Sequence, residues 1–187
     1  KLSSVNFDLN LINDIAHMCK EKKTKLFIDA ENNHYNNKYQ SITSDLMLNY
    51  NHHKGVIYKT YQMYRKDSLN ILNSDLLMCN KYNKKFCGKL VRGAYWNSEF
   101  KDGHLFTNKS ETDDSYNQGI LDIYNFRANI SPNVVLATHN KSSAQLGIML
   151  NKSEKIFDFA HLQGMREKYY NKHVLNQNIH VYIPCLL

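Results

Sequence analysis

KLVRGAYWN, residues 89–97, starts as a short apolar strand and breaks at Gly93. The cations Lys89 and Arg92 stand at the two ends of the apolar run, and a small residue and two aromatic rings follow the glycine. In a barrel of parallel strands, ligands bind where strands end and loops begin. The stretch therefore predicts a barrel strand whose end presents backbone, charge and ring faces to a flat anionic cofactor.

Five further apolar runs have the same character. They are short, rich in β-branched and aromatic residues and bounded by polar residues, which is typical of strands. The six runs span residues 25–30, 55–61, 88–96, 133–140, 155–162 and 178–184. Helix-like segments at 44–50, 68–78, 112–126 and 140–150 lie between them, and another at 9–21 precedes the first run.

This alternation predicts an α/β fold in which parallel strands are joined by right-handed crossovers. The runs start about 20 to 45 residues apart, which favours a (β/α)8 TIM-type barrel. A barrel needs eight units and six are visible, so we expect a partial barrel that lacks two units at the front and the last helix. A doubly wound open sheet is the competing topology. No linker-like composition divides the chain, so residues 1–187 are expected to form a single domain.

Composition narrows the classes of function. A hydrophobic content of 42% is too high for disorder, and the net charge of +7 is compatible with an acidic partner such as a phosphorylated cofactor. The lysines are dispersed, so we expect a solvated basic surface and no binding of nucleic acid. The four cysteines share no C-x-x-C spacing, which argues against a zinc site or a disulfide framework and favours a reducing compartment.

Polar or aromatic residues close nearly every run, and they suggest two kinds of chemistry. In the first, carboxylates and imidazoles would bind a metal, as in barrel hydrolases. The candidates are Asp29, Glu31, His139 and His161. No H-x-H pair concentrates the ligands, so a metal site is disfavoured.

In the second, the strand ends would surround a flavin, whose ring and pyrophosphate need hydrogen-bond donors, cations and close backbone approach. Glycine and alanine at 93 and 94 would allow that approach. The groups that would serve a flavin are Gln62, Lys89, Arg92, Gly93, Ala94, Thr138 and His139.

Six motifs in order then indicate a family. They are D-A-E, Y-Q-x-Y, K-L-V-R-G-A-Y-W, A-T-H-N, F-x-x-L-x-G-M and Y-x-P, and they extend from about residue 26 to 184. The sequence resembles the catalytic barrel of proline dehydrogenase, which uses FAD to oxidise L-proline to pyrroline-5-carboxylate. The segments around residues 29–42 and 60–67 are more similar to the mitochondrial, eukaryotic-type enzymes than to the bacterial bifunctional ones.

The resemblance implies a role for each matching residue. Asp29 and Lys89 would be catalytic, with Lys89 beside flavin N5. FAD contacts are expected from Ile28, Gln62, Lys89, Arg92, Gly93, Ala94, Thr138, His139 and Asn140. Substrate contacts are expected from Asp29, Leu90, Tyr95 and Tyr182. No metal is implied.

The resemblance also implies a reaction and a location. A hydride equivalent would pass from proline to the flavin, and a quinone-type acceptor would receive the electrons. The enzyme would lie in mitochondria, in the matrix or in peripheral association with the inner membrane.

One departure from the family concerns the substrate carboxylate, which a pair of adjacent arginines binds in a Y-L-x-R-R motif. No two arginines are adjacent in this sequence. We therefore expect a fragment that is inactive alone. The alternatives are a non-catalytic remnant that still binds flavin, and a basic domain that stacks nucleic-acid bases on its tyrosines. The tyrosines are scattered at core-like spacing, which disfavours the last.

Overall fold

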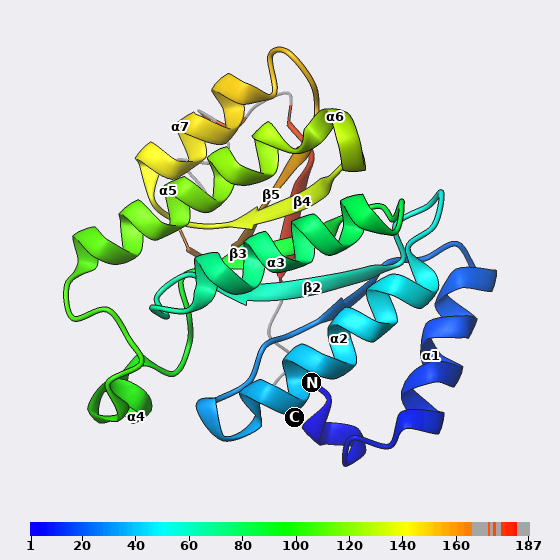
Figure 1. Cartoon of the computed structure of the whole chain (residues 1–187). Helices are drawn as coiled ribbons and strands as arrows, with labels where there is room; N and C mark the ends of the chain where they lie inside the picture. The colour runs from blue at the N-terminus through cyan, green and yellow to red at the C-terminus, as the bar shows by residue number, and fades with distance from the viewer. Residues whose placement is uncertain (166–171, 173, 175–176, 183–187) are drawn as a thin grey trace.

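The computed structural model describes residues 1–165, 172, 174 and 177–182. Its six strands form one sheet in the order β1-β2-β3-β4-β5-β6 (Figure 1). All five neighbouring pairs are parallel. The strands are β1 (Leu26–Ile28), β2 (Ile57–Gln62), β3 (Cys87–Val91), β4 (Asn133–Ala137), β5 (Phe157–Leu162) and β6 (Ile179–Tyr182). Each of the six predicted runs overlaps one strand, although β2 ends one residue after its run and β3 begins one residue before its run. Residues 183–184 of the last run lie outside the described residues.

The longer helices lie where amphipathic segments were predicted. They are α1 (Leu9–Glu21), α2 (Asn36–Tyr50), α3 (Ser68–Lys81), α5 (Lys109–Asn125) and α7 (Lys141–Leu150). Shorter ones are η1 (Ser3–Val5), η2 (Asn33–Tyr35), α4 (Trp96–Glu99), η3 (Phe100–Asp102) and α6 (Arg127–Ile130). Asn140 caps α7 by accepting a hydrogen bond from the Ser143 N–H, as a capping residue should.

Helix α2 starts eight residues before the predicted segment. The Asn-rich stretch at its start conceals an amphipathic turn, because Asn36, Tyr39 and Thr43 are buried against the sheet. Their three- and four-residue spacing places them on one face of the helix. Asparagine is a poor helix former, so here tertiary packing overrides local propensity.

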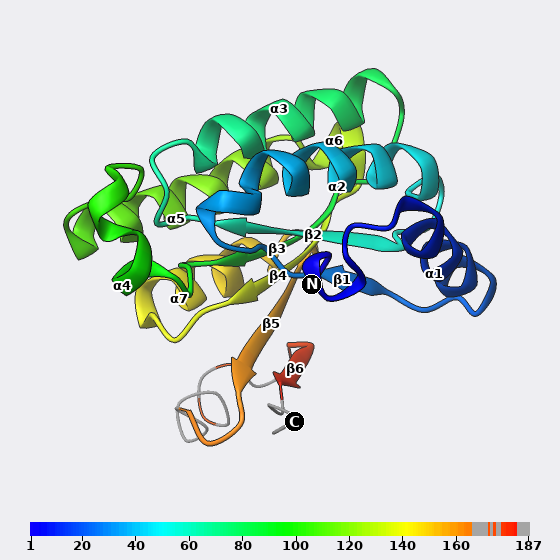
Figure 2. The ribbon, with the colours of Figure 1, turned by 90° about the horizontal axis from the view of Figure 1, so that it is seen from below.

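The sequential strand order decides between the two predicted topologies. A doubly wound sheet reverses its strand order at a switch point, whereas this sheet adds each new strand on the same side. Figure 2 shows helices α2, α3, α5 and α6 above the sheet, while β5 and β6 curl away below it. The partial TIM-type barrel is therefore confirmed, and the doubly wound alternative is wrong.

Contacts across the concave face show how far the sheet curls. At the start of β1, Lys25 Nζ lies 3.5 Å from a carboxylate oxygen of Asp158 on β5. The rings of Phe27 and His180, on β1 and β6, have centroids 6.5 Å apart. Strands at opposite ends of the sheet order are thus brought face to face.

Two turns at the N-terminal ends of the strands are built in the same way. Asn51 Oδ1 accepts the N–H groups of Val56 and Ile57 at 2.9 and 2.8 Å, and its amide donates to the Ile57 carbonyl. Asn151 makes the same three bonds, with Ile156 and Phe157. One asparagine therefore satisfies the backbone at the entry to β2, and another does so at β5.

Side chains alternate between the two faces of each strand. Leu90, Leu136 and Phe159 point outward into the core that the helices cover. Lys89 and Val91, the neighbours of Leu90, line the concave face instead. This alternation sorts apolar side chains toward the helices and functional groups toward the interior.

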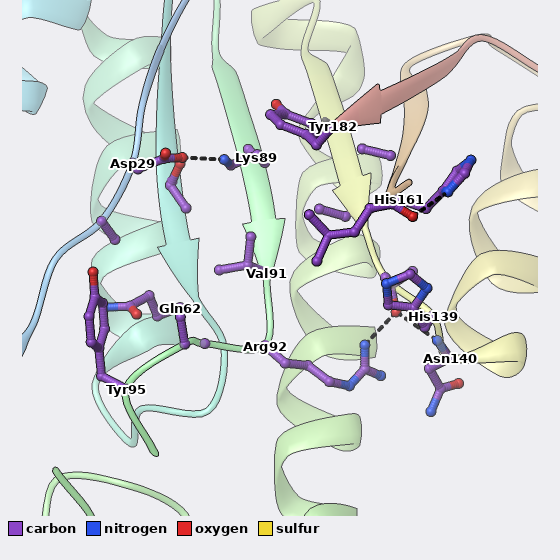
Figure 3. A pocket seen from close by; sticks show the side chains of 18 of the residues that line it. Asp29, Gln62, Lys89, Val91, Arg92, Tyr95, His139, Asn140, His161 and Tyr182 are labelled. Atoms are coloured by element: carbon purple, nitrogen blue, oxygen red, sulfur yellow. Dashed lines mark hydrogen bonds and ion pairs between the residues drawn. The ribbon is translucent and has the colours of Figure 1, made fainter. Parts of the chain in front are cut away.

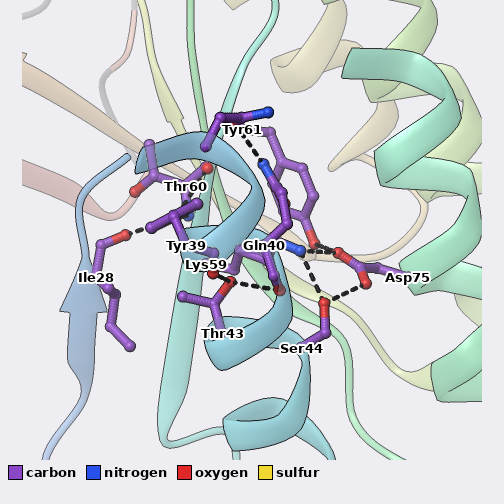
Figure 4. A network of polar contacts seen from close by, with 10 residues as sticks. Ile28, Tyr39, Gln40, Thr43, Ser44, Lys59, Thr60, Tyr61 and Asp75 are labelled. Carbon is purple, nitrogen blue, oxygen red and sulfur yellow. Dashed lines mark hydrogen bonds and ion pairs between the residues drawn. The ribbon is translucent and has the colours of Figure 1, made fainter. Parts of the chain in front are cut away.

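A charged pair is buried between β2 and the helices (Figure 4). Lys59, 1% exposed, donates from Nζ to Asp75 Oδ2 at 2.6 Å. The same carboxylate accepts from the Tyr61 hydroxyl at 2.8 Å and from the Ser44 hydroxyl at 2.9 Å. Burial lowers the pKa of Lys59, and the Asp75 charge opposes that shift. The network compensates a buried ammonium that would otherwise be costly.

The Tyr39 hydroxyl, from α2, lies between β1 and β2. It accepts a hydrogen bond from the Thr60 N–H at 2.8 Å and lies 3.0 Å from the carbonyls of Ile28 and Thr60. Burial raises the pKa of this phenol strongly, so it stays protonated as a donor. Tyr39 thereby fixes the backbone from which Asp29 and Thr60 reach the interior.

We predict that Asp75→Ala lowers the free energy of unfolding by about 3–5 kcal/mol, because it leaves the Lys59 ammonium buried and unpaired. Ser44→Ala removes a neutral partner and should cost about 1 kcal/mol. Urea denaturation followed by circular dichroism measures both. Equal losses in the two variants would contradict the assigned role of the ion pair.

Candidate active site

A cavity of about 860 Å³ opens on the concave face, at the carboxyl ends of the strands. Its volume lies within the range of ligand pockets. Among the described residues, the cations Lys1, Lys89, Arg92, Lys109 and Lys141 line it together with one carboxylate, that of Asp29. Figure 3 shows side chains from several strands converging on it. The balance of charge favours an anionic ligand.

Three predicted residues meet at one end of the cavity. Lys89 donates from Nζ to the Asp29 carboxylate and lies 5.1 Å from the centroid of the Tyr182 ring. Lys89 is buried, whereas the Asp29 side chain is 53% exposed and faces the cavity. Burial, with the nearby Asp29 charge, raises the pKa of Tyr182 and keeps the phenol neutral. This end offers a carboxylate, an ammonium and a ring to a small polar molecule.

Arg92 joins several elements around the cavity. Its Nε donates to Asp113 Oδ1 at 2.8 Å, and its terminal nitrogens donate to the hydroxyls of Thr138 and Ser143. Its guanidinium lies 4.5 Å from the centroid of the Tyr116 ring. The side chain therefore lines the cavity while it connects β3 to α5, to the end of β4 and to α7. A fixed cation of this kind is preorganised for an anion.

Gln62 closes β2, and its side chain also reaches the cavity. Its amide nitrogen donates to the Glu31 carbonyl at 3.0 Å, across the loop that follows β1. This bond uses one of the two amide N–H groups, so the amide oxygen and the second N–H remain for a ligand.

Gly93 is explained by its neighbour Tyr64. Its φ is +140°, and a Cβ at this position would lie 2.2 Å from a carbon of the Tyr64 ring. We expected the glycine to permit close approach of a pyrophosphate. The structure adds a second reason for glycine, because Tyr64 occupies the side from which a side chain would project. Ala94 and Tyr95 continue the lining beyond it.

The A-T-H-N segment contributes the wall next to Arg92. Thr138 is buried, and its hydroxyl accepts from Arg92 and from the Asn140 N–H at 3.1 Å. His139 and Asn140 also line the cavity, as predicted (Figure 3). The start of α7 therefore faces the cavity with its cap and its first residues.

Two predicted residues do not reach the cavity. Leu90 is fully buried on the helix side, where its side chain would lie 3.6 Å from a Cβ at Gly119 on α5. The expected substrate contact of Leu90 is therefore wrong, because alternation along β3 turns Val91 inward instead. Ile28 packs in the core and offers its carbonyl to Tyr39, so it is not part of the lining either.

The four metal-ligand candidates do not form a cluster. Within the described residues, no group of three or more His, Cys, Asp and Glu side chains could hold a metal ion. Glu31 turns away to accept the Ser3 N–H at 2.9 Å, whereas His161 stays at the cavity.

Some lining residues were not predicted. Alternation along the strands could have indicated Thr60, Val91, Ala160 and Leu162. Lys1, Lys109, Lys141 and Ser142 carry no signal in the sequence, because loops and helix starts bring them to the rim. In the part of the chain that the structure describes, no helix is long and apolar enough to span a bilayer.

A family model described as proline dehydrogenase matches residues 1–185. The chain belongs to the proline dehydrogenase family. It is 30% identical over 194 residues to proline dehydrogenase 1, mitochondrial, of Dictyostelium discoideum, covering 94% of this chain and 34% of that protein. It is 32% identical over 173 residues to proline dehydrogenase 2, mitochondrial, of Arabidopsis thaliana, covering 83% and 36%.

Other similarities add detail to this membership. A hydroxyproline dehydrogenase of Xenopus laevis is 30% identical over 169 residues, covering 81% of this chain and 36% of that protein. The crystal structure of proline utilization A from Bdellovibrio bacteriovorus, inactivated by N-propargylglycine, superposes with a TM-score of 0.85 at 20% identity, covering 94% of this chain and 20% of that one. This proline dehydrogenase family member thus spans about a third of the length of the curated relatives named here.

We predict that Gly93→Ala lowers the free energy of unfolding by about 2–5 kcal/mol, because a Cβ there adds a clash with Tyr64 to an unfavourable φ. Gly103→Ala is the matched control. Gly103 has φ +73° but open space around it, so its change should cost about 1 kcal/mol. Thermal unfolding compares the two, and similar losses would contradict the role given to Tyr64.

Proposed function

We propose that this chain contributes the cavity of an enzyme that oxidises L-proline to 1-pyrroline-5-carboxylate with FAD. The observation that carries the proposal is the pairing of Lys89 with Asp29 beside Tyr182, at one end of a cavity that is otherwise cationic. Family membership supports the reaction class. Because the chain spans about a third of its relatives, the activity is proposed for the enzyme to which this cavity belongs.

The lining residues fit the chemistry of FAD. The rim presents Arg92, Lys109 and Lys141 near the start of α7, which suits a diphosphate. Gln62 and His139 offer hydrogen-bonding groups to a ring, and Gly93 and Ala94 line the same cavity. We propose these residues, with Lys89, Thr138 and Asn140, as the FAD-binding set. When it is bound, a flavin supplies the acceptor for a hydride equivalent.

The opposite end of the cavity fits a small amino acid. The Lys89 ammonium is held by Asp29 and faces Tyr182, so the three side chains restrain one another's orientation. Positioning and preorganised charge are what the protein contributes to such a reaction. We propose Asp29 and Lys89 as catalytic residues, and Tyr95, Tyr182 and Val91 as the walls around proline.

The proposal extends to partners and place. The mitochondrial names of relatives from an amoeba, a yeast, a nematode and a plant support a mitochondrial location for this chain. We propose a quinone-type acceptor for the electrons and peripheral association with the inner membrane. Both follow from the family resemblance.

We predict that titration of the enzyme to which this cavity belongs with FAD gives a bound-flavin absorbance spectrum, and that proline bleaches it under anaerobic conditions. Bound flavin that proline leaves oxidised would favour the non-catalytic alternative. No bound flavin at all would overturn the proposal.

We predict that Lys89→Ala slows the bleaching by roughly 10²-fold, because it removes the cation fixed beside Asp29. Lys152→Ala is the control. Lys152 is exposed at the turn before β5, at the opposite end of the strands, and its change should leave the rate unaltered. An unchanged rate in Lys89→Ala would remove Lys89 from the catalytic residues.

A further inference from the structure

Glu99 is a carboxylate buried in a segment that is otherwise open to solvent. It ends the short helix α4, in the connection between β3 and α5, and is 3% exposed. Trp96, Asn97, Ser98 and Phe100 around it are all exposed. Figure 2 places α4 beyond the end of the sheet toward which the arrowhead of β2 points. Burying a carboxylate is costly unless donors compensate it, so its partners matter.

Those partners come from two other loops. Glu99 Oε1 accepts the backbone N–H of Asn33, in the loop after β1, at 2.5 Å. Glu99 Oε2 accepts the hydroxyl of Tyr64, in the loop after β2, at 3.2 Å. One side chain therefore joins three consecutive connections at the carboxyl end of the sheet. Asn33 and Tyr64 precede Glu99 by 66 and 35 residues along the chain.

Tyr64 connects Glu99 to the segment that lines the cavity. Its ring packs where a side chain on Gly93 would project, and its backbone N–H donates to the Arg92 carbonyl at 2.8 Å. Burial and then the Glu99 charge raise the pKa of the Tyr64 phenol, and the backbone of Tyr95 acts in the opposite direction. The phenol therefore remains a donor to Glu99 while it contacts the backbone of a residue that lines the cavity.

Tyr95 is held from the other side by α4. Its carbonyl accepts the N–H groups of Ser98 and Glu99 at 3.1 and 3.0 Å. Residues four apart lie on the same face of a helix, so Glu99 anchors the turn that Tyr95 begins. The loop after β1 is fixed in its turn, because Arg65 donates to the Asn33 side chain at 3.1 Å and to both carboxylate oxygens of Asp67.

We propose that Glu99 is a positioning residue, whose carboxylate holds the Gly93–Tyr95 wall of the cavity by bonding to Asn33 and Tyr64. That Gly93 and Ala94 of this wall face FAD, and Tyr95 the substrate, rests on the proposed function. The positioning itself rests on the contacts above, since Glu99 does not line the cavity. It acts on a ligand only through Tyr64, Gly93 and Tyr95.

The test compares Glu99→Ala with Glu99→Gln. Alanine removes both acceptors. Glutamine keeps the link, because its Oε1 can accept the Asn33 N–H and its Nε2 can donate to the Tyr64 oxygen. Tyr64→Phe removes one bond while it retains the ring against Gly93, so it remains informative if the alanine variant fails to fold. Asp75→Ala is the control for destabilisation that does not touch the wall.

Two readouts separate positioning from stability. Trp96 is the single tryptophan of the chain, and its ring centroid lies 4.5 Å from that of Phe100 with the ring planes tilted by 36°, so acrylamide quenching of its fluorescence reports on α4 without any ligand. The dissociation constant for FAD, from flavin fluorescence, reports on the wall. Both are measured below the unfolding transition of every variant.

We expect Glu99→Ala to increase quenching of Trp96 and to weaken FAD binding about tenfold, the value of one hydrogen bond to a charged group. Tyr64→Phe should change both in the same direction and less, whereas Glu99→Gln and Asp75→Ala stay close to the parent. Unchanged quenching in Glu99→Ala overturns the proposal, as does unchanged FAD affinity when the parent binds FAD. If the parent binds no FAD, the proposed function fails. The quenching of Trp96 fluorescence then decides by itself whether Glu99 is a positioning residue.

Discussion

In each of the six strands, successive side chains point to opposite faces. Because the sheet is curled, the two faces lie in different environments. The outer face is covered by helices, so Leu90, Leu136 and Phe159 pack there and exclude water. The inner face opens at its carboxyl end, where Lys89 and Val91 meet a cavity. Every proposed function of the chain depends on this division, because a shift of one residue in register would exchange the two sets.

Polar side chains that are buried or half-buried then fix the loops at the open end of the sheet. Arg92 ties β3 to α5 and α7, Tyr39 holds the backbone beside Asp29, and Glu99 joins three connections. Each of these groups has its hydrogen-bonding capacity met by partners distant in sequence. Such networks specify one arrangement of a loop, whereas apolar contacts alone would allow several. The cavity is therefore shaped both by Arg92 on its surface and by Tyr39 and Glu99 behind it.

The sequence was sufficient to predict where the strands lie, because short β-branched runs at regular spacing leave few alternatives. It was also sufficient to predict which residues reach the site from the ends of β1, β2, β3 and β4. These residues are Asp29, Gln62, Arg92 and Thr138. It failed at Leu90, where a motif resemblance was preferred to the alternation of the strand. Tyr64 and Glu99 could not be predicted as partners, since only the folded chain brings them together across 35 residues. The early start of α2 was hidden because its buried face is built from asparagine, tyrosine and threonine.

The paired asparagines at the entries to β2 and β5 have a further consequence. Each turn uses a single side chain, Asn51 or Asn151, to satisfy the backbone five and six residues later. Most of the residues between are exposed, and they include His52, Lys54, Lys152 and Lys155. Gly55 is the exception, because it is half-buried and a Cβ there would lie 2.1 Å from Cys87 Sγ. At the end of the barrel remote from the cavity, these exposed positions can thus change their composition and charge under mutational drift, while Asn51, Asn151 and Gly55 maintain the two turns.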